Sequence, residues 1–248
     1  MERVRRKSLL YRSGLGFWCL NHVQGCAHGC RYPCYASLMA RRYGRAKDEA
    51  DWRRPRLVEN AVVLLERELS RRRGRLDVVH LCLTTDPFMV GHPEVAATSL
   101  ALIECLNAHG VPASVLTKGI LPPELAGPRF DRRNVLGISL VSLDEGFRER
   151  FEPGAAPYAD RIAAVERLHA AGCRTLVHIE PYPTPNIVKQ EIRPLLGAVA
   201  FANELYFGGW NYSSLAGAYA DRDAFYREQG RIVRGFCREH RVRGTVDA

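Results

Sequence analysis

The sequence lacks any apolar run of the roughly 18 to 20 residues that would span a bilayer, and its charged start leads into no hydrophobic signal stretch. It also lacks a repeat of fixed period and any low-complexity segment. These absences argue against membrane, exported and solenoid proteins. We therefore expect a soluble, cytoplasmic protein with no membrane partner, folded as a single domain over residues 1–248.

Lysine is scarce: only four of the 36 basic residues are lysines, although the formal net charge is +9. A positive surface favours polyanionic partners such as nucleic acid, because Lys and Arg displace counterions from phosphates. The basic excess is almost all arginine, which a GC-rich genome also produces without any binding role. Nucleic-acid contact and an ordinary solvated surface therefore both remain open.

The chain alternates apolar, strand-like segments with amphipathic helical ones, and this alternation predicts an α/β fold with a parallel sheet. The expected strands are Phe17–Val23, Val78–Thr85, Ala113–Lys118, Val135–Ser142, Thr175–Pro181 and Glu204–Tyr212. The expected helices are Leu57–Arg72, Glu94–His109, Tyr158–Ala171, Glu191–Ala202 and a closing helix over Asp221–Arg241. Six strands are too few for the eight-stranded closed barrel, so an open (β/α)6 barrel or a doubly wound sheet remains.

Three of the eight cysteines, Cys26, Cys30 and Cys34, lie within nine residues of one another, directly after the first expected strand. With Gly25 and Gly29 letting the backbone wrap closely, three thiolates can bind three irons of a cubane and leave the fourth iron open. The alternative is a zinc site completed by a nearby histidine. Such sites usually contain pairs of cysteines with two residues between them, and no second pair is present, so the spacing favours a cluster.

The loop over residues 21–36 contains Gly-Cys-Ala-His-Gly-Cys-Arg-Tyr-Pro-Cys-Tyr-Ala and resembles that of the radical S-adenosylmethionine (SAM) superfamily, in its spore photoproduct lyase-like branch, which includes DNA repair photolyase-like proteins. Members of that branch read Gly-Cys-x-His-x-Cys-x-Tyr-Cys-Tyr-Ala. Here Pro33 lengthens the second gap by one residue. The resemblance continues in family order to about Asn186, through Thr84–Phe88, Leu116–Lys118, Ile138–Ser142, Phe151–Ala155, Arg161–Ile162 and Ala171–Gly172.

This resemblance implies a partial (β/α)6 TIM-like barrel of the radical SAM type, with a [4Fe-4S] cluster and SAM as cofactors. In this family the amino and carboxylate groups of SAM chelate the open iron. An electron from the reduced cluster cleaves the sulfonium C–S bond to give methionine and a 5′-deoxyadenosyl radical, which abstracts hydrogen from substrate. A reductant protein such as a flavodoxin or ferredoxin is also implied. Nucleic acid is the first expectation for the substrate, and a peptide or small metabolite is the alternative. A non-catalytic, zinc- or cluster-stabilised nucleic-acid-binding module is a third hypothesis.

The resemblance also implies roles for single residues. Cys26, Cys30 and Cys34 are the expected cluster ligands. Lys118, at the C-terminal end of an expected strand, would neutralise the methionyl carboxylate of SAM. The other expected cofactor contacts are hydroxyl and aromatic side chains, namely Tyr32, Tyr35, Thr85 and Ser142.

Strand alternation predicts which polar side chains face the cavity. The expected cavity residues lie at or near strand ends and are Asp86, His178, Glu180, Tyr182, Trp210 and Asn211. The same alternation would turn Cys82 inward. The spore photoproduct lyases, however, place their hydrogen-donating cysteine at the position that Leu83 holds here. We therefore do not expect thymine-dimer repair from this chain.

Overall fold

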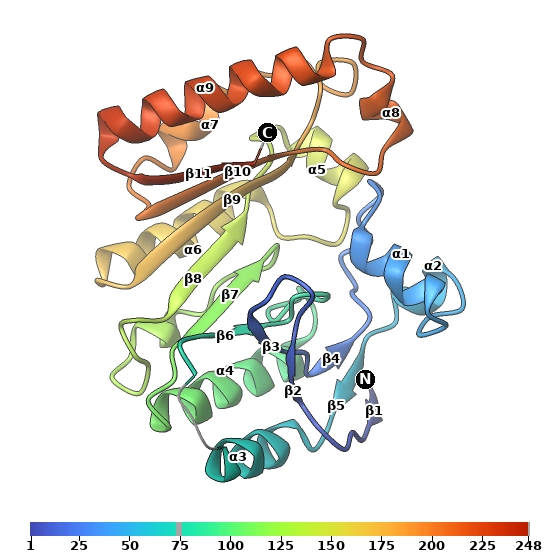
Figure 1. The fold of residues 1–248 in the computed structure, drawn as a ribbon, viewed down its shortest axis with the longest axis vertical. Helices are drawn as coiled ribbons and strands as arrows, with labels where there is room; N and C mark the ends of the chain where they lie inside the picture. Colours follow the sequence, from blue (N-terminus) through green and yellow to red (C-terminus); the bar gives the residue numbers. More distant parts are fainter. Residues whose placement is uncertain (73–75, 248) are drawn as a thin grey trace.

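The computed structural model describes residues 1–72 and 76–247, and its main element is an eight-stranded, strongly twisted sheet (Figure 1). The strand order is β2 (Leu10–Arg12), β3 (Trp18–Leu20), β6 (Val79–Leu81), β7 (Ala113–Thr117), β8 (Val135–Ser139), β9 (Arg174–Tyr182), β10 (Glu204–Gly209) and β11 (Arg243–Asp247). All neighbours are parallel except β2 and β3.

The strand order decides between the two architectures that the sequence left open. From β3 to β11 the strands follow one another in chain order, whereas a doubly wound sheet reverses its order at a switch point. The sheet is therefore wound in one direction, as in a barrel that does not close. All six expected strands are present, which confirms the predicted α/β fold.

Helices cover the outer face of the sheet (Figure 1). They are α3 (Ala61–Arg71), α4 (Pro93–Ala108), the short 3₁₀ helix η1 (Pro123–Ala126), α5 (Glu145–Phe151), α6 (Tyr158–Ala170), α7 (Ile192–Ala198), α8 (Ser214–Gly217) and α9 (Arg222–His240). The expected closing helix is α9, and it buries Tyr226, Val233 and Phe236 beneath an arginine-rich outer side. No described helix has both the length and the hydropathy of a membrane-spanning segment.

A second, small sheet near the N-terminus was not expected. It has the order β1 (Glu2–Val4), β5 (Arg56–Val58), β4 (Val23–Gln24). The helix expected from Leu57 was therefore wrong at its start: Leu57 pairs with Val23, and the helix begins at Ala61. This pairing joins segments more than 30 residues apart, so local periodicity could not show it. Two helices between β4 and β5 in the chain were also missed. They are α1 (Tyr35–Arg42) and α2 (Glu49–Trp52).

The last strand, β11, is parallel to β10 and was missed as well. Its residues Arg243–Asp247 are mostly exposed and not alternately apolar, so they carry no strand pattern of their own. β11 is extended because its backbone N–H and C=O groups pair with those at the edge of β10. β11 also places Asp247 beside the cavity described below, since the Asp247 carboxylate accepts a hydrogen bond from Tyr206 (3.1 Å).

Candidate functional site

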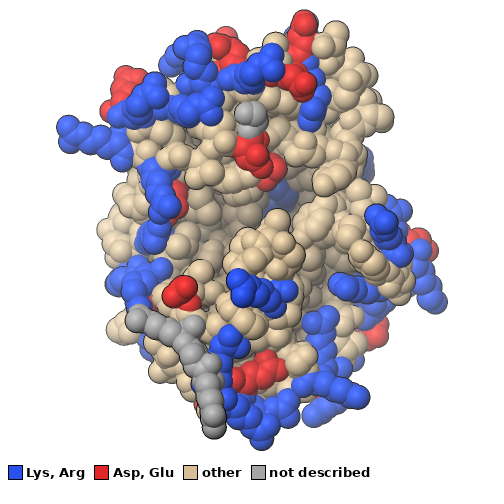
Figure 2. Space-filling view, in the orientation of Figure 1, with Lys and Arg blue, Asp and Glu red and all other residues tan. Residues whose placement is uncertain are grey.

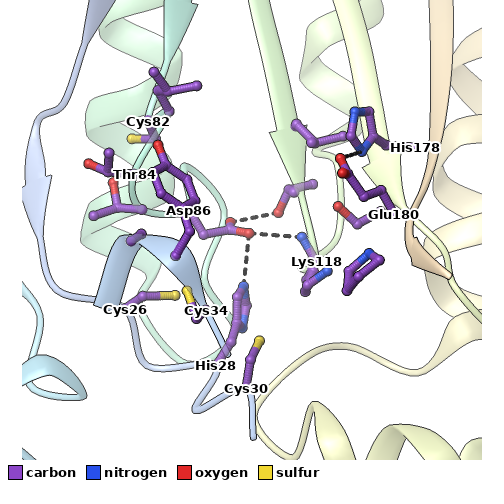
Figure 3. A pocket seen from close by; sticks show the side chains of 18 of the residues that line it. Cys26, His28, Cys30, Cys34, Cys82, Thr84, Asp86, Lys118, His178 and Glu180 are labelled. Atoms are coloured by element: carbon purple, nitrogen blue, oxygen red, sulfur yellow. Dashed lines mark hydrogen bonds and ion pairs between the residues drawn. The ribbon is translucent and has the colours of Figure 1, made fainter. Parts of the chain in front are cut away.

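A cavity of about 820 Å³ lies at the C-terminal ends of the parallel strands, where loops gather in folds of this kind. The cluster loop (residues 21–36) forms one side, and the ends of β6 to β10 form the other. Figure 3 shows Cys26, Cys30 and Cys34 at one side of this space and His178 and Glu180 at the opposite side. All three cysteines are free thiols that line the cavity.

The spacing of these sulfurs bears on the choice between cluster and zinc. Within the described residues, the three sulfur atoms are not all within 4.8 Å of one another. A zinc ion bound to sulfur at about 2.3 Å would hold its sulfurs about 3.8 Å apart, whereas each sulfur of a cubane binds a different iron. The three sulfurs are therefore not gathered as they would be around a single zinc ion. Burial raises the pKa of the Cys30 thiol to about 12, and bound iron would reverse this effect.

Two glycines let the cluster loop fold tightly. Gly25 has φ +81°, and a Cβ there would lie 2.5 Å from the carbonyl oxygen of Trp52. The next residue, Cys26, donates its backbone N–H to that same oxygen (3.0 Å). Gly29 has φ +60° and lies against the side chain of Arg53. The loop is thus held against α2 at positions that a side chain would obstruct.

Asp86 ties the cluster loop to two strands. Its Oδ2 lies 2.9 Å from Nε2 of His28 and accepts the backbone N–H of Lys118 (2.8 Å), while its Oδ1 accepts from the hydroxyl of Thr117 (2.6 Å) and the backbone N–H of Phe88 (2.8 Å). Burial would raise the pKa of Asp86, but His28 and the other donors hold it below its usual value. With its oxygens engaged in this way, Asp86 positions the cavity wall.

A second buried carboxylate, Glu152, organises the region around Lys118. Its Oε1 accepts the hydroxyl of Tyr32 (2.8 Å) and lies 3.2 Å from Nζ of Lys118, and its Oε2 lies 2.9 Å from the Arg161 guanidinium. Burial would raise the pKa of Glu152, yet Lys118 and Arg161 together lower it to about 2. Glu152 therefore stays ionised and fixes the ammonium of Lys118 at the cavity edge.

Four of the five expected SAM contacts line the cavity: Tyr32, Tyr35, Thr85 and Lys118. Among the described residues, the buried hydroxyl of Thr85 has no hydrogen-bond partner, so it can receive one from a bound molecule. The fifth, Ser142, is fully buried outside the cavity lining, where its hydroxyl donates to Oε1 of Gln190 (2.7 Å).

Among the expected substrate residues, Asp86, His178, Glu180, Trp210 and Asn211 line the cavity, and Tyr182 does not. Tyr182 is fully buried and packs on Phe207 and Phe225. The expected alternation along β9 ends at Glu180, because the register between β9 and β10 shifts beside Tyr182. The side chain of Tyr182 thus points into the core.

The alternation expected along Val78–Asp86 also ends early. β6 ends at Leu81, and Cys82 has φ +59°. After Leu81 the side chains therefore no longer alternate between the two faces as they do in a strand. As a result Cys82 and Leu83 both line the cavity. The sulfur of Cys82 lies 3.4 Å from Nδ1 of His22, whose Nε2 faces the hydroxyl of Ser99 (3.0 Å).

Tyr206 and Ser114 were not expected as site residues, although both line the cavity. Tyr206 stacks on His178 with ring centroids 4.1 Å apart and ring planes 1° apart. Tyr206 on β10 is the register partner of His178 on β9, and this pairing places it at the cavity. Such a partner becomes visible only when the strand order is known.

The far wall of the cavity has an uncharged imidazole beside a carboxylate. Burial, with Lys118 and His80 adding to it, lowers the pKa of His178 to about 3. Glu180 lies 3.7 Å from His178, and burial together with Asp247 raises its pKa. Among the described residues, Lys118 is the one lysine, and there is no arginine, in the cavity lining.

These features, a three-thiol loop beside an open-barrel cavity, define a class of enzyme, and the family comparison agrees. A model described as the radical SAM superfamily matches residues 20–198. The chain therefore belongs to the radical SAM superfamily. Enzymes of this superfamily use a [4Fe-4S] cluster and SAM.

Solved structures share the fold. Spore photoproduct lyase complexed with dinucleoside spore photoproduct matches with a TM-score of 0.71 and 15% identity, over 98% of this chain and 80% of the lyase. A lyase mutant with bound AdoMet and the same dinucleoside gives 0.69 and 14% over the same shares. Methylornithine synthase matches less closely, with a TM-score of 0.51 and 14% identity over 77% of this chain and 52% of the synthase.

Curated relatives are themselves uncharacterized. An uncharacterized protein of Mycobacterium tuberculosis (strain H37Rv) is 29% identical over 226 residues, which are 84% of this chain and 66% of that protein. The uncharacterized protein ORF301 of Acidianus two-tailed virus is 24% identical over 186 residues, which are 71% of this chain and 59% of ORF301. The matches thus span about three fifths to two thirds of the length of these relatives.

Proposed function

We propose that this enzyme holds its [4Fe-4S] cluster through Cys26, Cys30 and Cys34 and abstracts hydrogen from a nucleic-acid substrate placed in the cavity. One observation carries the proposal: three free thiols on one loop face the same cavity as Lys118 and the unpartnered hydroxyl of Thr85. When bound, the cluster supplies the electron that cleaves the sulfonium of SAM. An electron donor is needed, and we propose a flavodoxin or ferredoxin.

The residues around the cluster loop fit the binding of SAM. Lys118 projects its ammonium into the cavity from the end of β7, and Glu152 holds that ammonium in place. We assign Lys118 to the methionyl carboxylate, because a fixed cation binds a carboxylate at little ordering cost. The hydroxyl of Thr85 would pair with the amino group or the ribose, and Tyr32 and Tyr35 would pack on the adenine.

The distribution of charge supports a nucleic-acid substrate. In Figure 2 basic residues gather mainly toward the periphery of this face, and the hollow at its centre has acidic residues at its upper edge and a basic residue inside it. The lining as described contains three imidazoles, stacked aromatic rings and no arginine. Peripheral arginines would bind phosphates, while the cavity would receive an uncharged base and sugar. The lyase neighbour bound to a dinucleoside photoproduct agrees with such a substrate.

A peptide or small metabolite with a basic group is the second candidate. The observation that favours it is the pair of carboxylates Glu180 and Asp247, near one another at the far wall. An ammonium or amidinium group of a substrate would bind there. Binding of a nucleic-acid substrate would instead depend on the arginines outside the cavity.

The first experiment is anaerobic reconstitution with iron and sulfide, followed by reductant and SAM. We expect about four irons per chain and slow formation of 5′-deoxyadenosine without substrate. Cys30→Ala should lose both, because the cubane loses a ligand. The matched control is Cys237→Ala, since Cys237 lies on the buried face of α9 and does not line the cavity. Nucleoside formation by Cys30→Ala at the normal rate would refute the ligand assignment.

The second experiment measures binding of single- and double-stranded DNA and RNA at rising salt. Phosphate contacts predict that the logarithm of the binding constant falls linearly with the logarithm of the salt concentration, by about 0.7 to 0.9 per contact. No measurable binding at low salt would reject the nucleic-acid substrate. It would leave the cofactor assignment intact and direct the search to cationic metabolites and peptides.

A further inference from the structure

Three metal-ligating side chains meet on the outer helices, away from the cavity lining. They are Glu66 on α3, Cys105 on α4 and His109 at the end of α4. Cys105 and His109 are four residues apart and so lie on one face of the helix. Helix α3 packs against α4 and brings Glu66 to that face (Figure 1). Among the described residues, no other three His, Cys, Asp or Glu side chains bring their ligand atoms within 4.8 Å of one another.

The distances within this trio match those around a tetrahedral zinc ion. Nε2 of His109 is 3.1 Å from each carboxylate oxygen of Glu66, and Sγ of Cys105 is 3.4 Å from Oε2. Bonds of about 2.0 Å from zinc to nitrogen and oxygen and about 2.3 Å to sulfur place N and O about 3.3 Å apart and S and O about 3.5 Å apart. One ion could therefore bind all three atoms with only small side-chain movements.

The trio is reachable from solvent but is not a set of free surface groups. The side chain of Glu66 is 57% exposed and that of His109 is 29% exposed, while Cys105 is partly buried. Water can therefore complete the coordination. A thiolate and an imidazole select a borderline-soft ion over magnesium or calcium, which prefer oxygen ligands.

We propose that Glu66, Cys105 and His109 form a zinc site that clips α3 to α4, with water as the fourth ligand. Binding releases the thiol proton of Cys105, so the affinity should rise with pH. The site stands apart from the cluster, and the proposal does not depend on the identity of the substrate. One consequence concerns metal analysis: a count of one zinc per purified chain would not by itself show that the cluster cysteines hold zinc.

The test uses the iron-loaded protein, so that the cluster cysteines are occupied. Zinc is added in a calorimeter, and bound zinc and iron are then counted. We expect one zinc per chain with no loss of iron. Cys105→Ser and Glu66→Gln should each weaken binding at least tenfold. Glu104→Gln is the matched control, because Glu104 lies on the same helix but pairs with Arg129.

Three outcomes would overturn the proposal. The first is that the iron-loaded protein binds no zinc at micromolar concentration. The second is that both variants bind zinc as the unmodified protein does. The third is that zinc binding displaces iron. Circular dichroism of each variant verifies its folding, and X-ray absorption of the bound zinc should show one sulfur neighbour. A zinc shell of three sulfurs would place the ion at the cluster loop instead.

Discussion

Glu152 and Asp86 are the two buried carboxylates on which the cavity wall depends. Glu152 joins Tyr32, Lys118 and Arg161, and Asp86 joins the cluster loop to the ends of β6 and β7. Removing one member of a buried ion pair costs about 3 to 5 kcal/mol, because the remaining charge is left without compensation. These two residues therefore give the clearest predictions at the residue scale.

Glu152→Gln should lower the free energy of unfolding at pH 7 by about 3 kcal/mol, because Arg161 and Lys118 lose their shared counterion. The pKa of Glu152 falls from about 4.5 to about 2 on folding, so its stabilising effect is complete above pH 4.5 and is lost as the pH falls toward 2. Urea unfolding measures the free energy of unfolding at pH 7 and at pH 3. The difference between these two values should be smaller in the variant than in the unmodified protein.

The control for this prediction is Glu228→Gln. Glu228 is exposed and pairs with Arg231 one turn away on α9, so its removal should leave the free energy of unfolding nearly unchanged. Equal stability of Glu152→Gln and Glu228→Gln at pH 7 would contradict the role assigned to Glu152.

Asp86→Asn should reduce the iron that the protein retains after reconstitution. In the variant an amide NH₂ group, which donates, can take the place of Oδ2, which now accepts. The contact with His28 or the hydrogen bond from the backbone N–H of Lys118 is then lost. Stability should fall by about 2 kcal/mol. Iron analysis and urea unfolding measure the two effects. Asp223→Asn, at an exposed position beside Arg222, should change neither.

At the scale of elements, the cluster loop and helix α9 respond oppositely to the same substitution. Gly25→Ala introduces a Cβ at φ +81° against the Trp52 carbonyl, so it should destabilise the loop by about 1 to 3 kcal/mol. Gly235→Ala lies within α9 with open space around it, so it should stabilise the helix by up to about 1 kcal/mol. Thermal unfolding of both variants shows whether each substitution raises or lowers the melting temperature. A change in the same direction for both would contradict this account of the loop.

At the scale of the whole molecule, the cluster should raise the melting temperature. In the proposed arrangement it binds Cys26, Cys30 and Cys34 only when the chain is folded, so its binding free energy adds to that of folding. For a chain of this size, each kcal/mol raises the melting temperature by about 2 to 4 °C. Anaerobic calorimetry before and after iron removal measures the shift. An unchanged melting temperature would mean that no metal centre couples to the fold.

The six strands, the main helices and the cluster loop could all be predicted from the sequence, because each has a local signal. Buried strands are apolar, amphipathic helices have a 3.6-residue period, and the cluster cysteines are neighbours in the chain. Val23–Gln24, Leu57 and β11 lacked such a signal, since pairing with distant segments decides their conformation. Ser142 was expected at the cofactor and Tyr182 in the cavity, but the structure places both side chains outside the lining. These two positions also depend on contacts with distant segments, which the local pattern does not show.

By itself the sequence indicated a metal centre on one short loop, because Cys26, Cys30 and Cys34 are neighbours in the chain and their spacing favours a cluster over zinc. Only the tertiary structure decided what surrounds that loop. It brought Glu152 to Lys118, Asp86 to His28 and Tyr206 to His178, in each case from a different part of the chain. The physical reason is that ligand spacing is a local property, whereas the charge and shape of a cavity depend on strand order and register.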